Sequence, residues 1–194
     1  MAADELRLFV AIELSDEVRV ALGRLQAELR KRGLEKLRWV RLEGIHLTLK
    51  FLGETPPEKA PAIREALALA AQGVPAHELN LGSLGTFGGN NPRVLCVDLK
   101  GGLETALGLQ QRVDTELAKI GFPREGRAFS PHLTLARVRP ETAREMVDPL
   151  VEALGAVQPV SAATEVREIS LMRSILGRSG AVYERLAAFA LEQG

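Results

Sequence analysis

Short runs of β-forming residues alternate along the chain with longer amphipathic stretches, and the two patterns predict a mixed fold. Residues 6–14 are rich in β-branched and aromatic side chains, which is typical of a strand. A serine N-cap followed by two acidic residues then predicts a helix that ends near Gly33. Residues 38–42 and 45–52 are expected to be short strands, and Glu43-Gly44 between them favours a hairpin.

The rest of the chain continues this mixture of helices and strands. The expected helices cover residues 55–72, 103–120 and a segment that begins at 140 and is interrupted by Pro149. The expected strands cover residues 76–84, 93–100, 132–138, 164–176 and 181–191, with a loop at 85–92 and a turn at 177–180. Because hairpin-connected strands are mixed with helices, an α+β fold is favoured over a strictly alternating parallel α/β fold.

Composition restricts the class of protein. Of the 194 residues, 46% are hydrophobic and 26% are charged, which is the balance of a globular chain with a buried core. Lysine plus arginine equals aspartate plus glutamate at 25 each, so any contact with RNA is expected to be local and short. Cys96 lies in an apolar stretch and is expected to be a buried hydrophobe. With no leader peptide and no apolar run of membrane-spanning length, we expect a cytoplasmic monomer without membrane contact.

One four-residue string occurs twice, as His46-Leu-Thr-Leu49 and as His132-Leu-Thr-Leu135. The chain contains only 3 histidines, so coincidence explains the repeat poorly. On a strand, His46 and Thr48 point to one face while the leucines point to the other, and the same holds for His132 and Thr134. The repeat therefore predicts an internal duplication whose two copies face one another across a cleft.

Two histidines and two threonines suit the hydrolysis of a phosphodiester. One imidazole can deprotonate the attacking water while the other protonates the leaving alkoxide, and the threonine hydroxyls can donate to phosphoryl oxygens. Simple alternation also places Lys50 on the His46 face, where it would add positive charge. A structural histidine–threonine pair would explain one copy of the string but not two. A zinc site would need a third ligand at metal-like spacing, so no metal is expected.

The duplicated motif resembles that of the 2H phosphoesterase superfamily, and within it the RNA 2′,3′-cyclic phosphodiesterases once called 2′-5′ RNA ligases. The likeness covers essentially the whole chain. Further landmarks in family order are Arg7-Leu-Phe-Val-Ala-Ile12, Arg38-Trp-Val40, Ile45 to Glu54, Phe129 to Arg137, and Ser174, Gly180, Tyr183, Leu186 and Phe189.

The resemblance implies one bilobal domain over residues 1–194, with a motif in each lobe at 46–49 and 132–135. Antiparallel sheets related by pseudo-two-fold symmetry would line a central cleft, with helices on the outside. His46 would be the proton donor to the leaving 3′ oxygen, and His132 the proton acceptor that activates water. Arg137 matches an arginine expected to contact the phosphate, although simple alternation from His132 places it on the opposite face unless a twist or bulge intervenes. Its other interpretation is a solvated arginine at a strand end.

The implied activity is metal-independent hydrolysis of RNA 2′,3′-cyclic phosphate ends to 2′-phosphates without a cofactor, with weak 2′-5′ ligation as a side reaction. The partners would be RNA 3′ ends or small cyclic nucleotides. Alternatives are another small cyclic phosphate, a 2′-5′ linkage, or a non-catalytic module that binds RNA ends. Phe9 and Phe129 are candidates for base stacking or for the core, and His77 is expected at the surface. Arg41 and Ser130 depart from the family pattern.

Overall fold

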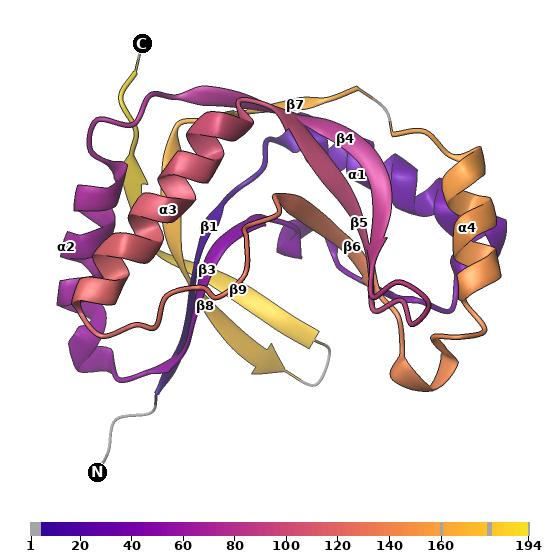
Figure 1. Ribbon diagram of the computed structural model, residues 1–194, viewed down its shortest axis with the longest axis horizontal. Coiled ribbons are helices and arrows are strands. Elements are labelled where there is room, and N and C mark those ends of the chain that lie inside the picture. Colours follow the sequence, from indigo (N-terminus) through magenta and orange to yellow (C-terminus); the bar gives the residue numbers. More distant parts are fainter. Residues whose placement is uncertain (1–4, 160, 178–179, 194) are drawn as a thin grey trace.

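The computed structural model describes residues 5–159, 161–177 and 180–193, which form two antiparallel sheets and four α-helices (Figure 1). The strands are β1 (Leu6–Ile12), β2 (Arg38–Trp39), β3 (Leu47–Thr55), β4 (His77–Phe87), β5 (Val94–Gly101), β6 (His132–Arg137), β7 (Ala163–Val166), β8 (Glu168–Gly177) and β9 (Gly180–Ala190). One sheet has the order β3-β1-β8-β9 and the other the order β2-β6-β5-β4-β7. The predicted α+β fold with two antiparallel sheets is confirmed.

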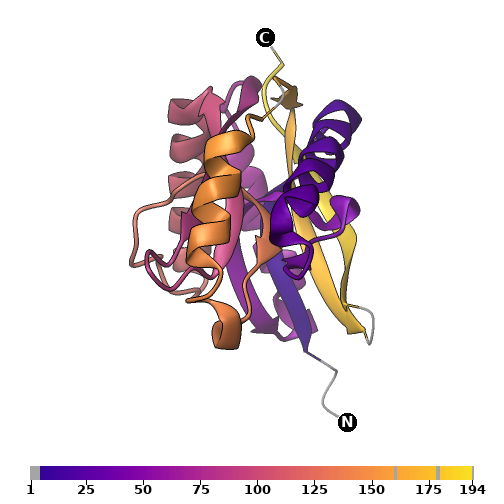
Figure 2. The same ribbon diagram turned by 90° about the vertical axis from the view of Figure 1, so that its right-hand side faces the viewer.

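The helices lie on the outside of the two sheets and connect them. They are α1 (Asp16–Leu29), α2 (Ala60–Ala71), α3 (Leu103–Lys119) and α4 (Val147–Ala156). Helix α1 follows β1 of the four-stranded sheet in the chain but packs beside the five-stranded sheet. Helix α3 follows β5 of the five-stranded sheet but packs against β3. Helix α2 packs beside α3, and Figure 2 shows α4 and α1 together on the opposite side of the molecule. Each lobe is therefore completed by a helix that follows a strand of the other lobe.

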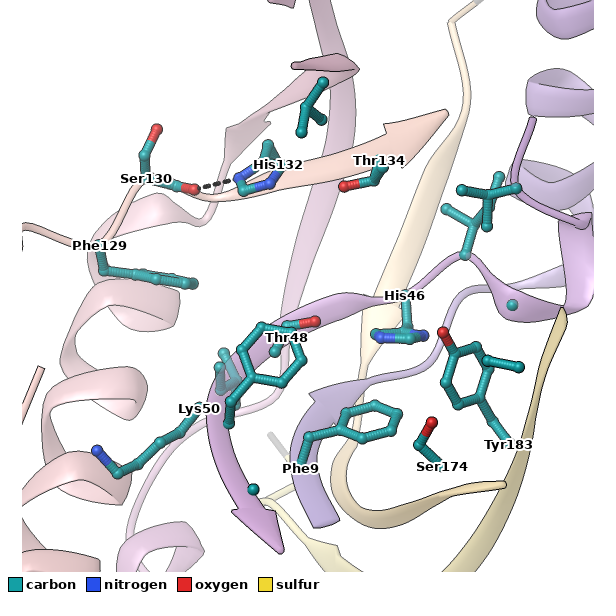
Figure 3. A pocket seen from close by; sticks show the side chains of 18 of the residues that line it. Phe9, His46, Thr48, Lys50, Phe129, Ser130, His132, Thr134, Ser174 and Tyr183 are labelled. Carbon is teal, nitrogen blue, oxygen red and sulfur yellow. Dashed lines mark hydrogen bonds between the residues drawn. The ribbon is translucent and has the colours of Figure 1, made fainter. Parts of the chain in front are cut away.

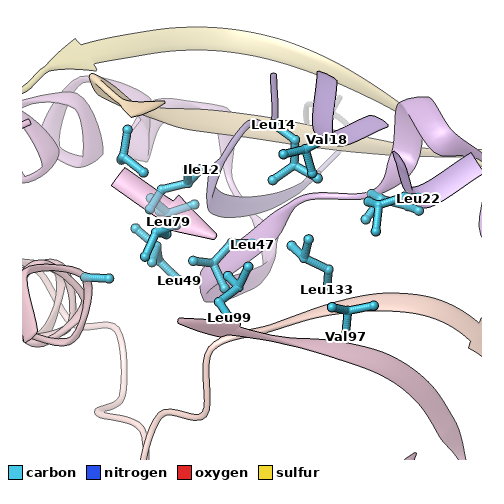
Figure 4. Packing of buried hydrophobic residues seen from close by; sticks show 14 of the residues in the cluster. Ile12, Leu14, Val18, Leu22, Leu47, Leu49, Leu79, Val97, Leu99 and Leu133 are labelled. Carbon is cyan, nitrogen blue, oxygen red and sulfur yellow. The ribbon is translucent and has the colours of Figure 1, made fainter. Parts of the chain in front are cut away.

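The core is formed by the leucines of the repeated motif and the apolar faces of these helices (Figure 4). Leu47 and Leu133 are 1% and 0% exposed, and they belong to one hydrophobic cluster with Val18 and Leu22 of α1. Ser15 begins α1 as predicted, because its hydroxyl accepts the backbone N–H of Val18 at 3.3 Å. Burial of the leucines leaves the histidine and threonine of each motif on the side away from this core.

The predicted hairpin of residues 38–42 and 45–52 is wrong. Strand β2 pairs with β6 in one sheet, while β3 pairs with β1 in the other. A 3₁₀ turn, Leu42–Gly44, connects them. Gly44 serves a close approach rather than a hairpin, since a Cβ there would lie 3.1 Å from Cε2 of Tyr183.

Several predicted boundaries also shift. The expected strand at 164–176 is two strands, β7 and β8, that break at Arg167 and join different sheets. The loop expected at 85–92 begins later, because β4 continues to its end at residue 87. The helices expected from 55 and from 140 start as 3₁₀ turns, Pro57–Lys59 and Pro140–Thr142, before α2 and α4 begin.

Pro149 lies in the first turn of α4 and does not interrupt it, since a first-turn proline removes no intrahelical hydrogen bond. In the expected turn at 177–180, Gly177 pairs with Gly180, and residues 178 and 179 lie outside the described residues. Among residues 5–159, 161–177 and 180–193, none of the helices combines the length and hydropathy that a membrane crossing requires.

Candidate active site

An open cavity of about 680 Å³ lies between the two sheets. His46 and Thr48 line it from the four-stranded sheet, and His132 and Thr134 line it from β6 of the other sheet (Figure 3). Arg137 lines the same cavity. The structure thus brings together all five residues that the sequence nominated, from positions about 90 residues apart in the chain.

Both motif strands contain a β-bulge at the same motif position. In β3, Ala11 pairs with Thr48 and Val10 with Lys50, so Leu49 is an extra residue. In β6, Cys96 pairs with Thr134 and Leu95 with Ala136, so Leu135 is the extra residue. A bulge makes two consecutive residues point to the same side and then restores the alternation. The duplication therefore extends to the irregularity of the backbone.

The bulge decides which side chains after each threonine face the cavity. Leu135 and Ala136 are both buried in the core, and Arg137 returns to the face of His132 and Thr134. Arg137 therefore faces the cavity, as contact with a phosphate requires, and not the side that simple alternation from His132 predicts. In the first copy the corresponding residue is Phe51, which is 66% exposed and also lines the cavity.

Lys50 occupies the position that corresponds to Ala136 and lines the cavity as expected, but its ammonium is bound within the fold. Its side chain is 2% exposed, and its ammonium donates to Oδ1 of Asp114 at 2.6 Å and to the carbonyl of Pro123 at 2.7 Å. Figure 3 shows it leaving β3 away from His46. Lys50 thus contributes its stem to the cavity wall, while its charge is used within the fold.

His46 is enclosed by aromatic rings. Phe9 of β1 stacks on its imidazole at 4.7 Å between ring centroids, and Tyr183 of β9 contacts it edge-on at 5.1 Å. Burial disfavours the charged imidazolium and lowers the pKa of His46 from 6.5 to about 4, against smaller opposing effects of the Gly44 backbone and Glu13. The free protein therefore holds His46 neutral at pH 7.

His132 is more open and is oriented by its own backbone. Its Nδ1 lies 2.8 Å from the carbonyl of Ser130, and its ring contacts Phe87 edge-on at 4.7 Å. A carbonyl only accepts, so this bond requires the proton on Nδ1 and leaves Nε2 available for proton exchange with a ligand. His46 also interacts with the backbone of Gly44, two residues before it.

The third histidine does not belong to the site. His77 lies at the start of β4, outside the cavity, and its Nδ1 is 3.1 Å from the carbonyl of Pro75. It is half-buried rather than at the surface, and its Nε2 finds no hydrogen-bond partner in the described part of the chain. His77 and His132 thus share the contact to the carbonyl two residues before them, but His46 and His132 are the histidines that line the cavity.

The cavity carries more positive charge than the neutral chain suggests. Arg7, Arg127 and Arg137 line it, and none of them takes part in an ion pair within residues 5–159, 161–177 and 180–193. Glu125 also lines it and lies 3.9 Å from Lys50. This local excess favours an anionic ligand.

Sequence analysis missed part of the site. Tyr183 and Ser174 were landmarks without a role, and both line the cavity (Figure 3). Phe51 could have been found from its spacing, because it follows His46 by the same five residues that separate Arg137 from His132. Phe9 is 2% exposed, so it belongs to a small buried cluster and yet contacts His46.

Other sequence expectations have mixed outcomes. Phe129 and Ser130 line the cavity, whereas Arg41 is exposed outside it. Cys96 is buried as expected, and burial raises the pKa of its thiol to about 12. In the part of the chain that the structure describes, no three histidine, cysteine or acidic side chains are grouped as metal ligands would be.

The repeat in the sequence has a counterpart among known families. The sequence model of the family described as LigT like Phosphoesterase matches residues 12–96 and again residues 97–183. The chain belongs to this family. Each matched segment contains one histidine–threonine motif, so the internal duplication is confirmed.

Relatives of known name cover nearly the whole chain. The RNA 2′,3′-cyclic phosphodiesterase of Methanothermobacter thermautotrophicus is 33% identical over 190 residues, which are 96% of this chain and 100% of that protein. That of Thermus thermophilus is 33% identical and covers 96% of this chain and 90% of its own length. This LigT-like chain is thus a homologue of RNA 2′,3′-cyclic phosphodiesterases.

Solved structures show the same fold. Escherichia coli LigT in its apo form has a TM-score of 0.76 and 28% identity, covering 98% of this chain and 100% of that protein. Its complex with 3′-AMP has a TM-score of 0.73, 28% identity and the same coverage, and that protein has also been solved with phosphate. The chain is therefore a phosphoesterase homologue whose solved relative binds a nucleotide.

Proposed function

We propose that this LigT-like protein hydrolyses RNA 2′,3′-cyclic phosphate ends to 2′-phosphates by metal-independent acid–base catalysis. The observation that carries the proposal is the convergence of two histidines and two threonines, from equally bulged strands, on one electropositive cavity. The names of the relatives support the same substrate class.

The proposed reaction is an in-line displacement. His132 takes a proton from water as the water oxygen attacks phosphorus, the bond from phosphorus to the 3′ oxygen breaks, and His46 gives its proton to that oxygen. The products are a 2′-phosphate and a 3′-hydroxyl. Attacking and leaving oxygens lie on opposite sides of phosphorus, and the two histidines belong to opposite sheets of the cleft, which supports this division of labour.

The low pKa of His46 in the free protein bears on its role as donor. At a pKa of about 4 the ring is neutral at pH 7 and lacks the second ring proton that a donor gives up. A bound cyclic phosphate places a negative charge beside the ring, and an opposite charge favours the protonated form. His46 therefore gains its proton as the anion binds, and the surrounding Phe9 and Tyr183 keep water from that proton.

The phosphoryl oxygens are held by the remaining motif residues. Thr48 and Thr134 donate hydroxyl hydrogen bonds from opposite sheets, and Arg137 supplies a guanidinium that matches two oxygens at once. These contacts strengthen as charge builds on the oxygens in the transition state, which is the condition for accelerating the reaction.

The test is turnover of a short RNA ending in a 2′,3′-cyclic phosphate, measured in EDTA with identification of the terminal phosphate. We expect 2′-phosphate from the unmodified protein, and at least a 100-fold loss of kcat in His46→Ala and in His132→Ala. His77→Gln, outside the cavity, is the matched control and should retain activity.

The assay also separates the competing hypotheses. Full turnover in either alanine variant would contradict the acid–base roles, and activity lost in EDTA and restored by a metal would contradict the metal-free mechanism. Binding without turnover by the unmodified protein would support a non-catalytic module instead. Ligation through a 2′-5′ bond is the reverse reaction with a 5′-hydroxyl in place of water, so we expect it only as a weak side activity in water.

A further inference from the structure

A row of aromatic rings leads from the reaction centre along the four-stranded sheet. His46 stacks on Phe9, and Phe9 lies 6.1 Å from Phe51 between ring centroids. Phe9 is 2% exposed and is covered by its neighbours, whereas Phe51 at the end of the row is 66% exposed. An exposed phenyl ring on a strand costs free energy unless a ligand covers it, because its apolar surface remains in water.

The positively charged side chain of Arg7 lies beyond the ring of Phe51 on the same face of the four-stranded sheet. Arg7 precedes Phe9 by two residues on β1, and alternation along a strand puts both on the side opposite the buried Leu8. Arg7 is exposed and lines the cavity, and its cross-strand neighbour Glu54 neither forms an ion pair with it nor lines the cavity. The exposed side chain of Leu176 lines the cavity as well.

The reacting phosphate does not account for Arg7 and Phe51. A cyclic phosphate carries one negative charge, and Arg137, two residues beyond the bulge of β6, is the cation on the His132 side. Arg7 and Phe51 lie on the other sheet, past the buried Phe9. They offer one positive charge and one free aromatic face, which are the two features that a further nucleotide requires.

We propose that Arg7 and Phe51 form a subsite for the nucleotide on the 5′ side of the cyclic phosphate. Its base stacks on Phe51, and the phosphodiester that joins it to the terminal nucleotide pairs with Arg7. RNA continues only in the 5′ direction from such an end, so one adjacent subsite suffices. The inference rests on the proposed function and assigns its substrate class: an oligonucleotide end in preference to a mononucleotide.

The experiment compares kcat/KM for a mononucleotide 2′,3′-cyclic phosphate with that for a dinucleotide bearing the same terminal nucleotide. The unmodified protein should prefer the dinucleotide. Phe51→Ala should lose about tenfold on the dinucleotide, the scale of one stacking contact, and stay within about twofold on the mononucleotide. Arg7→Gln should reduce the slope of log kcat/KM against log salt for the dinucleotide by about 0.7, the share of one phosphate contact.

Matched controls make the same chemical changes elsewhere. Arg144→Gln removes an exposed arginine outside the cavity, and Val151→Ala removes apolar surface from a side chain that is 65% exposed on α4. Neither should change the substrate preference. Thermal unfolding of all four variants should match the unmodified protein, since each side chain is exposed.

Two results would overturn the subsite. One is equal turnover of the two substrates by the unmodified protein, and the other is an equal loss on both substrates in Phe51→Ala, which would place that ring against the terminal nucleotide. Absence of turnover on both substrates in the unmodified protein would instead refute the proposed function on which the subsite depends. The mononucleotide measurement thus distinguishes the two failures.

Discussion

At the scale of single residues, the two motif histidines are each followed by Leu-Thr-Leu but have different surroundings. His46 is packed between Phe9 and Tyr183, whereas His132 contacts Phe87 at the opening of the cleft. The first of these environments excludes water from an imidazole, which lowers the pKa of His46 to about 4. An identical motif therefore places its two histidines in different environments.

Burial of His46 makes the stability of the protein depend on pH. Its folded pKa of about 4 lies below the unfolded value of 6.5, so between these values the unfolded chain binds more protons. The contribution of His46 to the free energy of unfolding is fully present above about pH 6.5. It decreases by up to about 3 kcal/mol as the pH falls toward 4. Urea unfolding at pH 7 and pH 4.5 measures the change.

The effect is isolated by comparison with His46→Gln. The variant should lose less free energy of unfolding between the two pH values than the unmodified protein, whereas His77→Gln should follow the unmodified protein. An identical pH dependence in His46→Gln would show that the ring is not held neutral by burial.

At the scale of secondary-structure elements, each bulged strand receives a buried glutamine from a helix. Gln26 of α1 donates to the carbonyl of Leu135 at 3.2 Å and to that of Val40 at 2.9 Å. Gln110 of α3 donates to the carbonyl of Leu49 at 3.4 Å. A bulge disturbs the ladder of backbone hydrogen bonds, and the glutamines add donors beside it, although the Leu135 carbonyl also accepts the N–H of Val40 at 2.9 Å. The two glutamines therefore support the bulges that direct Phe51 and Arg137 into the cavity.

Gln26→Met keeps the volume of the side chain but removes its donor from a site that is 6% exposed. We expect the free energy of unfolding to fall by about 1–3 kcal/mol, because the two carbonyls lose a buried partner. Phosphodiesterase activity should fall as well, since Arg137 follows the bulge. Gln72→Met, on an exposed residue at the end of α2, is the control. Unfolding free energy unchanged within about 0.5 kcal/mol would count against the role of Gln26.

At the scale of the whole molecule, a buried ion pair links the two motif strands. Lys50 extends from β3 to Asp114 on α3, and both contact the loop that leads to His132, through the carbonyl of Pro123 and the N–H of Glu125. That loop continues to Ser130, whose carbonyl orients the second histidine. Lys50 thus lines one wall of the cavity and, through its ammonium, holds the loop of the opposite wall.

Asp114→Ala should destabilise the protein by about 3–5 kcal/mol, because it removes the close carboxylate from the buried ammonium of Lys50 and leaves only the half-exposed Glu125 at 3.9 Å. Lys50→Met should cost less, since Asp114 is 13% exposed and still accepts the N–H of Glu125. The double variant Lys50→Met/Asp114→Ala should recover most of the loss. Chemical unfolding of all four proteins completes the cycle, and additive effects of the two single changes would refute the coupling.

The amino-acid sequence by itself determined the type of most elements, the internal duplication and the histidine–threonine pairs of the site. These features are local, since strand alternation, helix caps and a repeated tetrapeptide each depend on residues a few positions apart. His46, Thr48, His132 and Thr134 could be named in this way because their leucine neighbours already define which side of the strand is buried.

Only the tertiary structure decided which sheet each strand joins, where the strands bulge and how strongly His46 is buried. Residues 38–42 looked like half of a hairpin, yet β2 pairs with β6, nearly 100 residues later in the chain. Arg137 faces the cavity, against simple alternation from His132, because the bulge of β6 restarts the alternation. Hydrogen-bond partners and desolvation come from segments far apart in the chain, so no local pattern contains them.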